Sequence, residues 1–366
     1  MTKVRNQHKE KPTGTDLEPT FVERLIYNWL ITDPNLNIST AKNYQVQHHD
    51  SMKYIFFFGG RLRTVKGRPI VILTGALIIV PAVLFWCYEA KWLWHNVSSA
   101  PVIIFSYMWM LTFMFFIRAS TSDPGVLPRN IHIPLKVDKT TKQFGPTAPE
   151  EYYNIISVPY YQNDNNGRAR SNDASINLKY CPTCHIWKPA RTSHCNVCNC
   201  CVLHHDHHCK FLNNCVGPRN YQYFLWFLLC ATIGNVLLFI LSFIQIFYYK
   251  LETIPSVQRF EQSINLHPAA FFLAIYSFFT MLYPALLLGF HLVLTSKYLT
   301  TREYLNNVWG KRHNPDFVNF FDTGSMWKNL YISWIGKPKG VSMFRLIDPY
   351  EPGDLRLEKI NPLPTF

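Results

Sequence analysis

The chain concentrates its metal-binding and nucleophilic residue types in residues 181–224, which hold eight of its ten cysteines and six histidines. This segment contains two Cys-x2-Cys pairs, Cys181 with Cys184 and Cys195 with Cys198. A two-residue gap lets a tight turn direct two thiolates at one tetrahedral zinc ion. Four further residues of ligand type follow: His194, Cys201, His208 and Cys215. The segment can therefore fill two four-coordinate zinc sites.

Cys209 is not among these eight ligand candidates, and it directly follows Asp206, His207 and His208. An imidazole that takes the proton of a thiol, and a carboxylate that orients this imidazole, are what an activated nucleophile requires. We therefore expect Cys209 to be the nucleophile, His207 its base and Asp206 the residue that holds the imidazole in the needed tautomer.

Two other interpretations of this segment stay open at this point. A cysteine-rich block in a reducing compartment is commonly a purely structural zinc module, in which a surplus cysteine is inert. Disulfides are the second alternative, but the Cys-x2-Cys gap favours metal. The membrane topology derived below also places the block in the cytosol, where thiols stay reduced.

The composition of the 366-residue chain is that of a membrane protein. Hydrophobic residues make up 48%, aromatic residues 16% and charged residues only 16%. A net charge of +13 could suit a nucleic-acid partner, but no basic helix or aromatic-studded strand pattern accompanies it. The positive charge lies beside apolar runs instead, so we expect no nucleic-acid partner.

Four apolar runs are long enough to cross ~30 Å of hydrocarbon as helices, which takes about 20 residues. They are Pro69 to Tyr88, Pro101 to Ile117, Tyr221 to Tyr249 and Pro268 to Leu294. A short polar connection that begins at Glu89 would join the first two, and His291 would be the one ionisable residue inside the helices. An ion or metal transporter places several such residues inside its helices, so the pattern argues against transport.

Lysine and arginine lie mainly on one side of these four helices. They precede the first helix, occur between the second and third, and follow the fourth, whereas the two loops on the other side are nearly neutral. Because positively charged loops stay in the cytosol, we expect both termini and the zinc domain there. Cys209 would then act at the membrane surface, and a fatty acyl thioester is a substrate that fits this place.

The order of these residues resembles the DHHC family of protein S-acyltransferases at every fixed position. It reads Cys181-x2-Cys184-x9-His194-Cys195-x2-Cys198-x2-Cys201-x4-Asp206-His207-His208-Cys209-x5-Cys215-x4-Asn220-x3-Phe224. Three further segments are similar to the family's DPG, TTxE and C-terminal motifs: Asp123-Pro124-Gly125, Thr300-Thr301-Arg302-Glu303 and Phe321 to Asn329. The resemblance covers the chain from about Pro69 to Trp334.

This resemblance implies a polytopic α-helical membrane protein with four transmembrane helices and a cytosolic cysteine-rich domain that binds two structural zinc ions between helices 2 and 3. One zinc ion would take Cys181, Cys184, His194 and Cys201, and the other Cys195, Cys198, His208 and Cys215. By residue type, Cys200, His204 and His205 compete for these places. Cys198-x2-Cys201 keeps the two-residue gap that Cys200 would lose, and the family leaves both histidines variable.

The implied activity is the transfer of a palmitoyl group from palmitoyl-CoA to Cys209, and then to a cysteine of a membrane-associated protein. Thr301 would bond Asp206. Lys188, Arg191 and Lys210 are candidates for the phosphates of CoA.

The acyl chain would lie between the helices, where Gly234 or Gly289 could set its length. The chain departs from the family at Lys210-Phe211, where members commonly have Pro-Trp.

Three phrases further resemble the branch of this family that acylates fungal Ras proteins: FFFGGRLRTVKG, KYCPTCHIWKPARTSHCNVCN and TTREYLNNV. This implies Ras-type GTPases as substrates, a small accessory subunit, and the endoplasmic reticulum rather than the Golgi as the membrane. The alternative to an enzyme is an inactive zinc-knuckle membrane adaptor. Such an adaptor would not need Asp206, His207 and Cys209 together.

These inferences divide the chain into six parts. We expect a cytosolic N-terminal region (1–68), transmembrane helices 1 and 2 (69–117), a cytosolic linker with the DPG motif (118–180), the zinc domain (181–220), transmembrane helices 3 and 4 (221–294), and a cytosolic C-terminal region with the TTxE motif (295–366).

Overall fold

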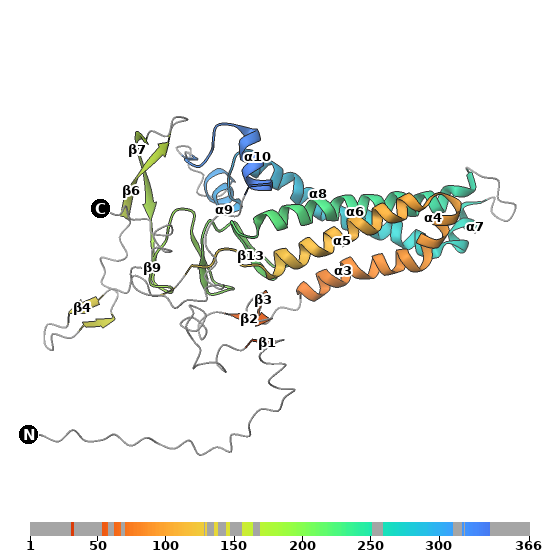
Figure 1. The fold of residues 1–366 in the computed structure, drawn as a ribbon, viewed down its shortest axis with the longest axis horizontal. Helices are drawn as coiled ribbons and strands as arrows, with labels where there is room; N and C mark the ends of the chain where they lie inside the picture. Colours follow the sequence, from red (N-terminus) through yellow and green to blue (C-terminus); the bar gives the residue numbers. More distant parts are fainter. Residues whose placement is uncertain are drawn as a thin grey trace, which may run out of the picture.

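The computed structural model describes residues 31–32, 53–57, 62–66, 70–127, 129, 135–137, 144–146, 156–163, 169–250, 259–309, 317 and 319–336. Four long helices run side by side in it (Figure 1). The bundle consists of α3 (Ile70–Leu84) with its continuation, α5 (Ser99–Thr121), α6 (Tyr221–Phe247) and α8 (Pro268–Ser296). Each is long and apolar enough to cross a membrane. The predicted four-helix membrane protein is therefore confirmed.

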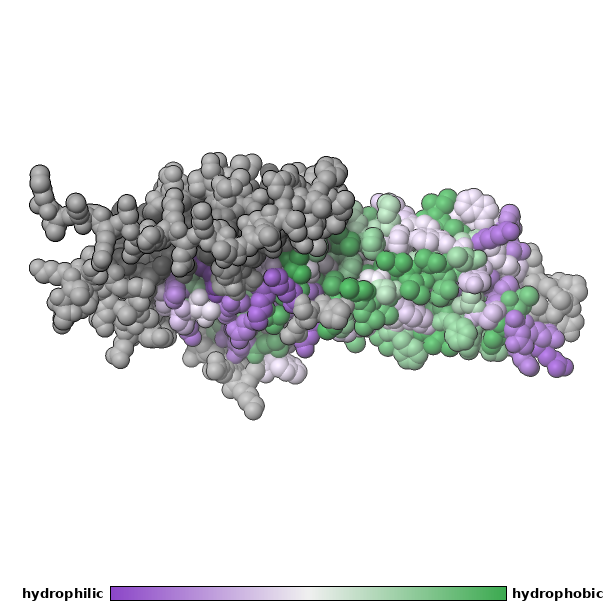
Figure 2. Space-filling model, turned by 90° about the horizontal axis from the view of Figure 1, so that it is seen from below, coloured by the Kyte–Doolittle hydropathy of each residue, from purple (hydrophilic) through white to green (hydrophobic). Residues whose placement is uncertain are grey.

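Large apolar side chains cover the outside of this bundle. Ile72 is 73% exposed, Phe272 67% and Leu286 75%. Figure 2 shows the resulting hydrophobic band over the helices, with hydrophilic residues at the tip of the bundle. Soluble monomers rarely expose apolar patches of this extent, whereas lipid chains would cover them.

The first helix runs further than the sequence predicts. After α3 it continues through a π-helical turn, η3 (Phe85–Glu89), and α4 (Ala90–Asn96). The expected polar connection is thus helical, and Ser98 accepts a hydrogen bond from the backbone of Ala100 at the start of α5. Glu89 lies inside the bundle, fully buried, and accepts a hydrogen bond of 2.8 Å from Ser242. This corrects the expectation that His291 is the one ionisable residue within the helices.

The cysteine-rich segment between α5 and α6 folds into three small antiparallel hairpins at one end of the bundle (Figure 1). They pair β8 (Tyr180–Cys181) with β9 (Ile186–Trp187), β10 (Ser193–Cys195) with β11 (Cys200–Val202), and β12 (His207–Cys209) with β13 (Asn214–Val216). Short helices follow the bundle: α9 (Thr301–Glu303), the π-helical η6 (Tyr304–Trp309) and α10 (Met326–Trp334). The turn η5 (Tyr248–Lys250) and α7 (Phe260–Leu266) lie between α6 and α8.

The linker between α5 and the zinc domain and the N-terminal region also contain strands. The linker carries hairpins of β4 (Leu135–Val137) with β5 (Phe144–Pro146), and of β6 (Ile156–Asn163) with β7 (Ala169–Leu178). The N-terminal region carries β1 (Ile31–Thr32), β2 (Tyr54–Phe57) and β3 (Leu62–Val65) in one antiparallel sheet. Four residues, among them Gly59 and Gly60, separate β2 from β3 in the sequence, which is a hairpin signal.

Candidate active site and metal clusters

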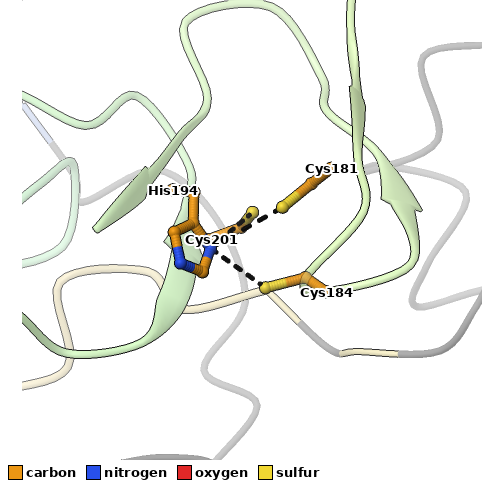
Figure 3. A group of neighbouring side chains, drawn as sticks. All are labelled: Cys181, Cys184, His194 and Cys201. Atoms are coloured by element: carbon orange, nitrogen blue, oxygen red, sulfur yellow. Dashed lines mark hydrogen bonds between the residues drawn. The ribbon is translucent and has the colours of Figure 1, made fainter. Parts of the chain in front are cut away.

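The first cluster gathers ligands from two hairpins. The side-chain atoms of Cys181, Cys184, His194 and Cys201 that could hold a metal all lie within 4.8 Å of one another. His194 Nδ1 lies 3.3 Å from the sulfur of Cys184 and 3.6 Å from that of Cys181, and all four side chains converge (Figure 3). His194 and Cys201 are directly paired across β10 and β11, so the strand register brings them together.

A second cluster with the same donor set lies on the other face of this hairpin. It contains Cys195, Cys198, His208 and Cys215, again within 4.8 Å. The sulfurs of Cys198 and Cys215 are 3.5 Å apart, and His208 Nδ1 lies 3.4 Å from Cys198. Three thiolates and one imidazole fit a closed tetrahedral structural zinc site. Both predicted ligand sets therefore converge as groups that could bind metal.

The competing ligand candidates lie outside both clusters. Cys200 is fully buried against the N-terminal hairpin, where its sulfur lies 3.8 Å from the hydroxyl of Tyr54. The His204 ring packs edge-on against Phe321. His205 is buried, and burial together with the nearby charge of Arg302 lowers its pKa to about 4.

Asp206, His207 and Thr301 form a hydrogen-bonded row behind Cys209. His207 Nδ1 lies 2.7 Å from Asp206 Oδ2. The same carboxylate accepts hydrogen bonds from the Thr301 backbone N–H (2.8 Å) and hydroxyl (2.6 Å). Thr301 begins α9, whose capping box Thr300 and Glu303 close. The TTxE motif thus brings a threonine to the carboxylate from a segment 95 residues away.

The electrostatics of this row favour an imidazolium beside a thiolate. Burial alone would lower the pKa of His207, but its hydrogen bonds with Asp206 and Cys209 raise it to about 10. Burial opposes ionisation of Cys209, yet the hydrogen bond and the charge of His207 lower the pKa of this thiol. Asp206 is also buried, but its bonds to His207 and Thr301 keep its pKa below the ordinary value.

Aromatic residues from the helices complete the site, and the sequence pattern did not assign two of them to it. Phe224 of α6 packs edge-on against the His207 ring at 5.4 Å between centroids. His291 of α8 lies 5.9 Å from the same ring, and its Nδ1 lies 2.9 Å from the Tyr221 hydroxyl. His291 could not be assigned to the site from spacing, because it lies more than 80 residues after His207 in the chain, and Tyr221 takes part through its hydrogen bond with His291.

A cavity of about 410 Å³ lies between the four helices. Cys209 packs in one cluster with Leu228, which lines the cavity. Phe211, two residues after Cys209, lines it too and contacts Tyr283 at 5.1 Å between ring centroids. Gly234 lies in the cavity wall, whereas Gly289 does not. The lining is mainly apolar, with Thr74, Thr112, Asn235 and Thr280 among its few polar residues, and it fits an acyl chain.

The three basic residues predicted to bind CoA phosphates differ in placement. Lys210 is exposed beside Cys209, and Lys188 is half-buried. The side chain of Arg191 is buried, donates to Glu303 (2.8 Å), the Tyr298 carbonyl (2.9 Å) and Asn319 (3.0 Å), and stacks over Phe321. The CoA role of Arg191 stays a prediction, and in the structure its guanidinium ties the zinc domain to the segment after α8.

Comparison with known proteins agrees with this geometry. The sequence model described as DHHC palmitoyltransferase matches residues 174–308. The palmitoyltransferase ERF2 of Debaryomyces hansenii is 51% identical over 95% of this chain and 93% of its own length. The palmitoyltransferase ERF2 of Saccharomyces cerevisiae is 38% identical over 98% and 94%, and that of Kluyveromyces lactis is 36% identical over 96% and 93%. The chain therefore belongs to the DHHC palmitoyltransferase family and is an acyltransferase.

Proposed function

We propose that this palmitoyltransferase moves the acyl group of palmitoyl-CoA to Cys209, and from there to cysteine thiols of Ras-type GTPases at the membrane. One observation carries the proposal: Cys209 forms a hydrogen bond with His207 of the Asp206–His207 pair and packs in one cluster with Leu228, which lines the apolar cavity. The thioester carbonyl can thus reach the sulfur while the acyl chain occupies the helix bundle. An inactive adaptor would need neither feature.

The first half-reaction forms the acyl-enzyme. The Cys209 thiolate attacks the thioester carbonyl, the bond from this carbonyl to the CoA sulfur breaks, and the CoA thiolate takes the proton of the His207 imidazolium. Asp206 and Thr301 hold the ring in place during this transfer. Each half-reaction exchanges one thioester for another, so catalysis lies mainly in positioning and in supplying a thiolate.

The second half-reaction reverses these roles. His207 takes the proton of an acceptor cysteine, whose thiolate attacks the acyl-Cys209 carbonyl and displaces Cys209 as thiolate. The two Cys3His clusters have no open position for a substrate. Zinc bound there would cross-link the hairpins that carry Cys209 and leave the chemistry to Cys209 and His207.

Topology and partners belong to the same proposal. The Lys and Arg asymmetry supports cytosolic termini and a cytosolic zinc domain, and the likeness to fungal palmitoyltransferases supports an endoplasmic reticulum membrane. Directly after Glu303, the side chains of Leu305, Val308 and Trp309 are exposed, Trp309 by 76%. We infer that a small accessory subunit covers this apolar face.

A two-stage transfer assay tests the proposed function. The purified chain is first loaded with labelled palmitoyl-CoA, freed of excess label, and then mixed with a Ras-type GTPase that carries C-terminal cysteines. We expect the label to leave the enzyme and to enter the GTPase as a hydroxylamine-sensitive thioester. A GTPase with serines at these positions is the control. Label that stays on the enzyme with the cysteine form would contradict the proposed substrate class.

A further inference from the structure

The N-terminal hairpin of β2 and β3 contacts the turn that carries the nucleophile. Cys209 ends β12, and a tight turn of Lys210 to Asn213 leads into β13. In this turn the Asn213 side-chain amide donates to the Val65 carbonyl at 2.7 Å and to the Thr64 hydroxyl at 3.1 Å. Both acceptors belong to β3, almost 150 residues earlier in the sequence.

The opposite side of the turn is fixed to the helix bundle. Asn214, which pairs with Cys209 across the hairpin, donates to the carbonyls of Ala119 (3.2 Å) and Ser122 (2.8 Å) at the end of α5. Asn213 and Asn214 are each 1% exposed. The turn that follows Cys209 is therefore held by two supports, the end of α5 and strand β3.

Strand β3 is itself fixed to two parts of the site. Arg63 forms a buried ion pair with Asp123 of the DPG motif at 3.1 Å and stacks over the ring of Tyr54. Tyr54 and Val65 pack in one core cluster with three ligands of the second metal cluster: Cys195, Cys198 and Cys215. The hairpin thus connects the DPG motif, this metal cluster and the catalytic turn.

We propose that the Tyr54–Val65 hairpin is part of the catalytic unit, with Asn213 and Arg63 as positioning residues that hold the Cys209 turn against the cavity. The hairpin itself, residues 54–65, lies outside residues 174–308, which the family's sequence model matches. The inference rests on acyl transfer through Cys209. It follows from the geometry because a displacement of about 1 Å of a reacting atom can cost up to about 10²-fold in rate.

The test separates position from thiolate formation. Asn213→Asp keeps the size of the side chain and the tolerance for the left-handed backbone at this residue (φ 48°), but it removes the amide donor. In the purified full chain we expect two metal ions, a KM for palmitoyl-CoA within about twofold of wild type and a kcat of autoacylation about 10-fold to 10²-fold lower. Alkylation of Cys209 by iodoacetamide should stay near the wild-type rate, since His207 is untouched.

A second variant and a control sharpen the result. Arg63→Met releases β3 from Asp123. The double variant with Asn213→Asp should lower the rate of autoacylation by less than the product of the two single fold-decreases, because both residues act through β3. Asn177→Asp, at an exposed residue of β7, is the matched control.

Three outcomes would overturn the inference. An unchanged kcat in Asn213→Asp removes the positioning role. Acylation, alkylation and metal content that fall together would show a purely structural role. A wild-type chain that takes up no label would overturn the acyl-Cys209 route and this inference with it. If the wild type is labelled and Asn213→Asp is acylated at the same rate, the inference alone is overturned.

Discussion

The two faces of strand β12 carry the same residue types and do different chemistry. His208 and its cross-strand partner Cys215 face the second metal cluster. His207 and Cys209 stand on the opposite face, where Cys209 packs with Phe224 and Leu288 of the helix bundle. Side chains alternate between the two faces of a strand, so neighbouring residues are sorted into a metal site and a nucleophile.

This difference teaches that residue type alone does not assign a role in a cysteine-rich domain. The same alternation operates in β10, where His194 faces the first cluster and Cys195 the second. Substitutions on the metal face should therefore lower the amount of folded protein, and substitutions on the bundle face should lower the rate of acyl transfer. The predictions below test this division, from the largest effect to the smallest.

His208→Ala should have the largest effect. It removes one of four ligands from the second cluster, which holds together the hairpins of β10–β11 and β12–β13. Because metal binding in such sites is coupled to folding, we expect the loss of one of two zinc ions and little folded protein. Elemental analysis and size-exclusion yield measure this. The matched control is His207→Ala, one residue away, and a loss of zinc in this control would contradict the sorting by strand face.

His207→Ala should instead slow acylation of Cys209 by about 10² to 10⁴-fold, the usual contribution of a general base. Without the imidazole, Cys209 loses the hydrogen bond that lowers the pKa of its thiol, and burial then favours the neutral thiol. Single-turnover uptake of labelled palmitoyl-CoA measures the rate. A decrease smaller than about threefold would show that the thiolate forms without His207 and that the bundle face holds no acid–base pair.

Thr301→Val should cost about tenfold in the same assay. The hydroxyl bond of 2.6 Å to Asp206 is lost, while the backbone N–H bond stays. A hydrogen bond to a charged group contributes about 1.5–3 kcal/mol, and the remaining bond keeps the loss near the lower limit. Thr301→Ser retains the hydroxyl and should recover most of the rate. A Thr301→Ser variant as slow as Thr301→Val would assign the effect to packing.

Lys210→Ala should have the smallest effect. Its exposed ammonium lies next to Cys209 in the chain, and exposed charges interact weakly and are screened by salt. We expect a KM for palmitoyl-CoA about two- to fivefold higher at low salt and unchanged kcat, with a smaller difference at high salt. A KM that does not depend on salt in wild type would exclude Lys210 from phosphate binding.

The sequence contained the chemistry more completely than the architecture around it. The ligand residue types, the Asp206–His207–Cys209 row and the four apolar helices follow from local spacing, whereas the division of the ligands into two sets came from the resemblance to the family. The structure brings these residues together. The environment of Arg191 could not be predicted, because its partners lie 107 to 128 residues away. For the same reason the helical position of Glu89 was missed. The apolar run in the sequence ends at Glu89, the first charged residue. The helix continues past it, and the buried carboxylate of Glu89 accepts a hydrogen bond from Ser242.

The N-terminal hairpin is a different case, because a signal was present. Two β-rich runs separated by Gly-Gly predict a hairpin, but nothing local shows that it packs on the metal cluster. Its contacts with Asp123 and Asn213 span 60 and about 150 residues. Local sequence patterns thus predict helices and strands, whereas the way these elements pack together depends on residues far away in the sequence.

The most direct test measures zinc content and acyl thioester in the same sample of three proteins. Wild type and Cys200→Ser should hold two zinc ions and take up hydroxylamine-sensitive label from palmitoyl-CoA, and Cys209→Ser should hold two zinc ions and take up none. Cys200 serves as the control because it is also a surplus buried cysteine of this domain. If Cys209→Ser lost zinc, or became acylated at the wild-type rate, the separation of nucleophile and metal ligands on opposite faces of β12 would be wrong.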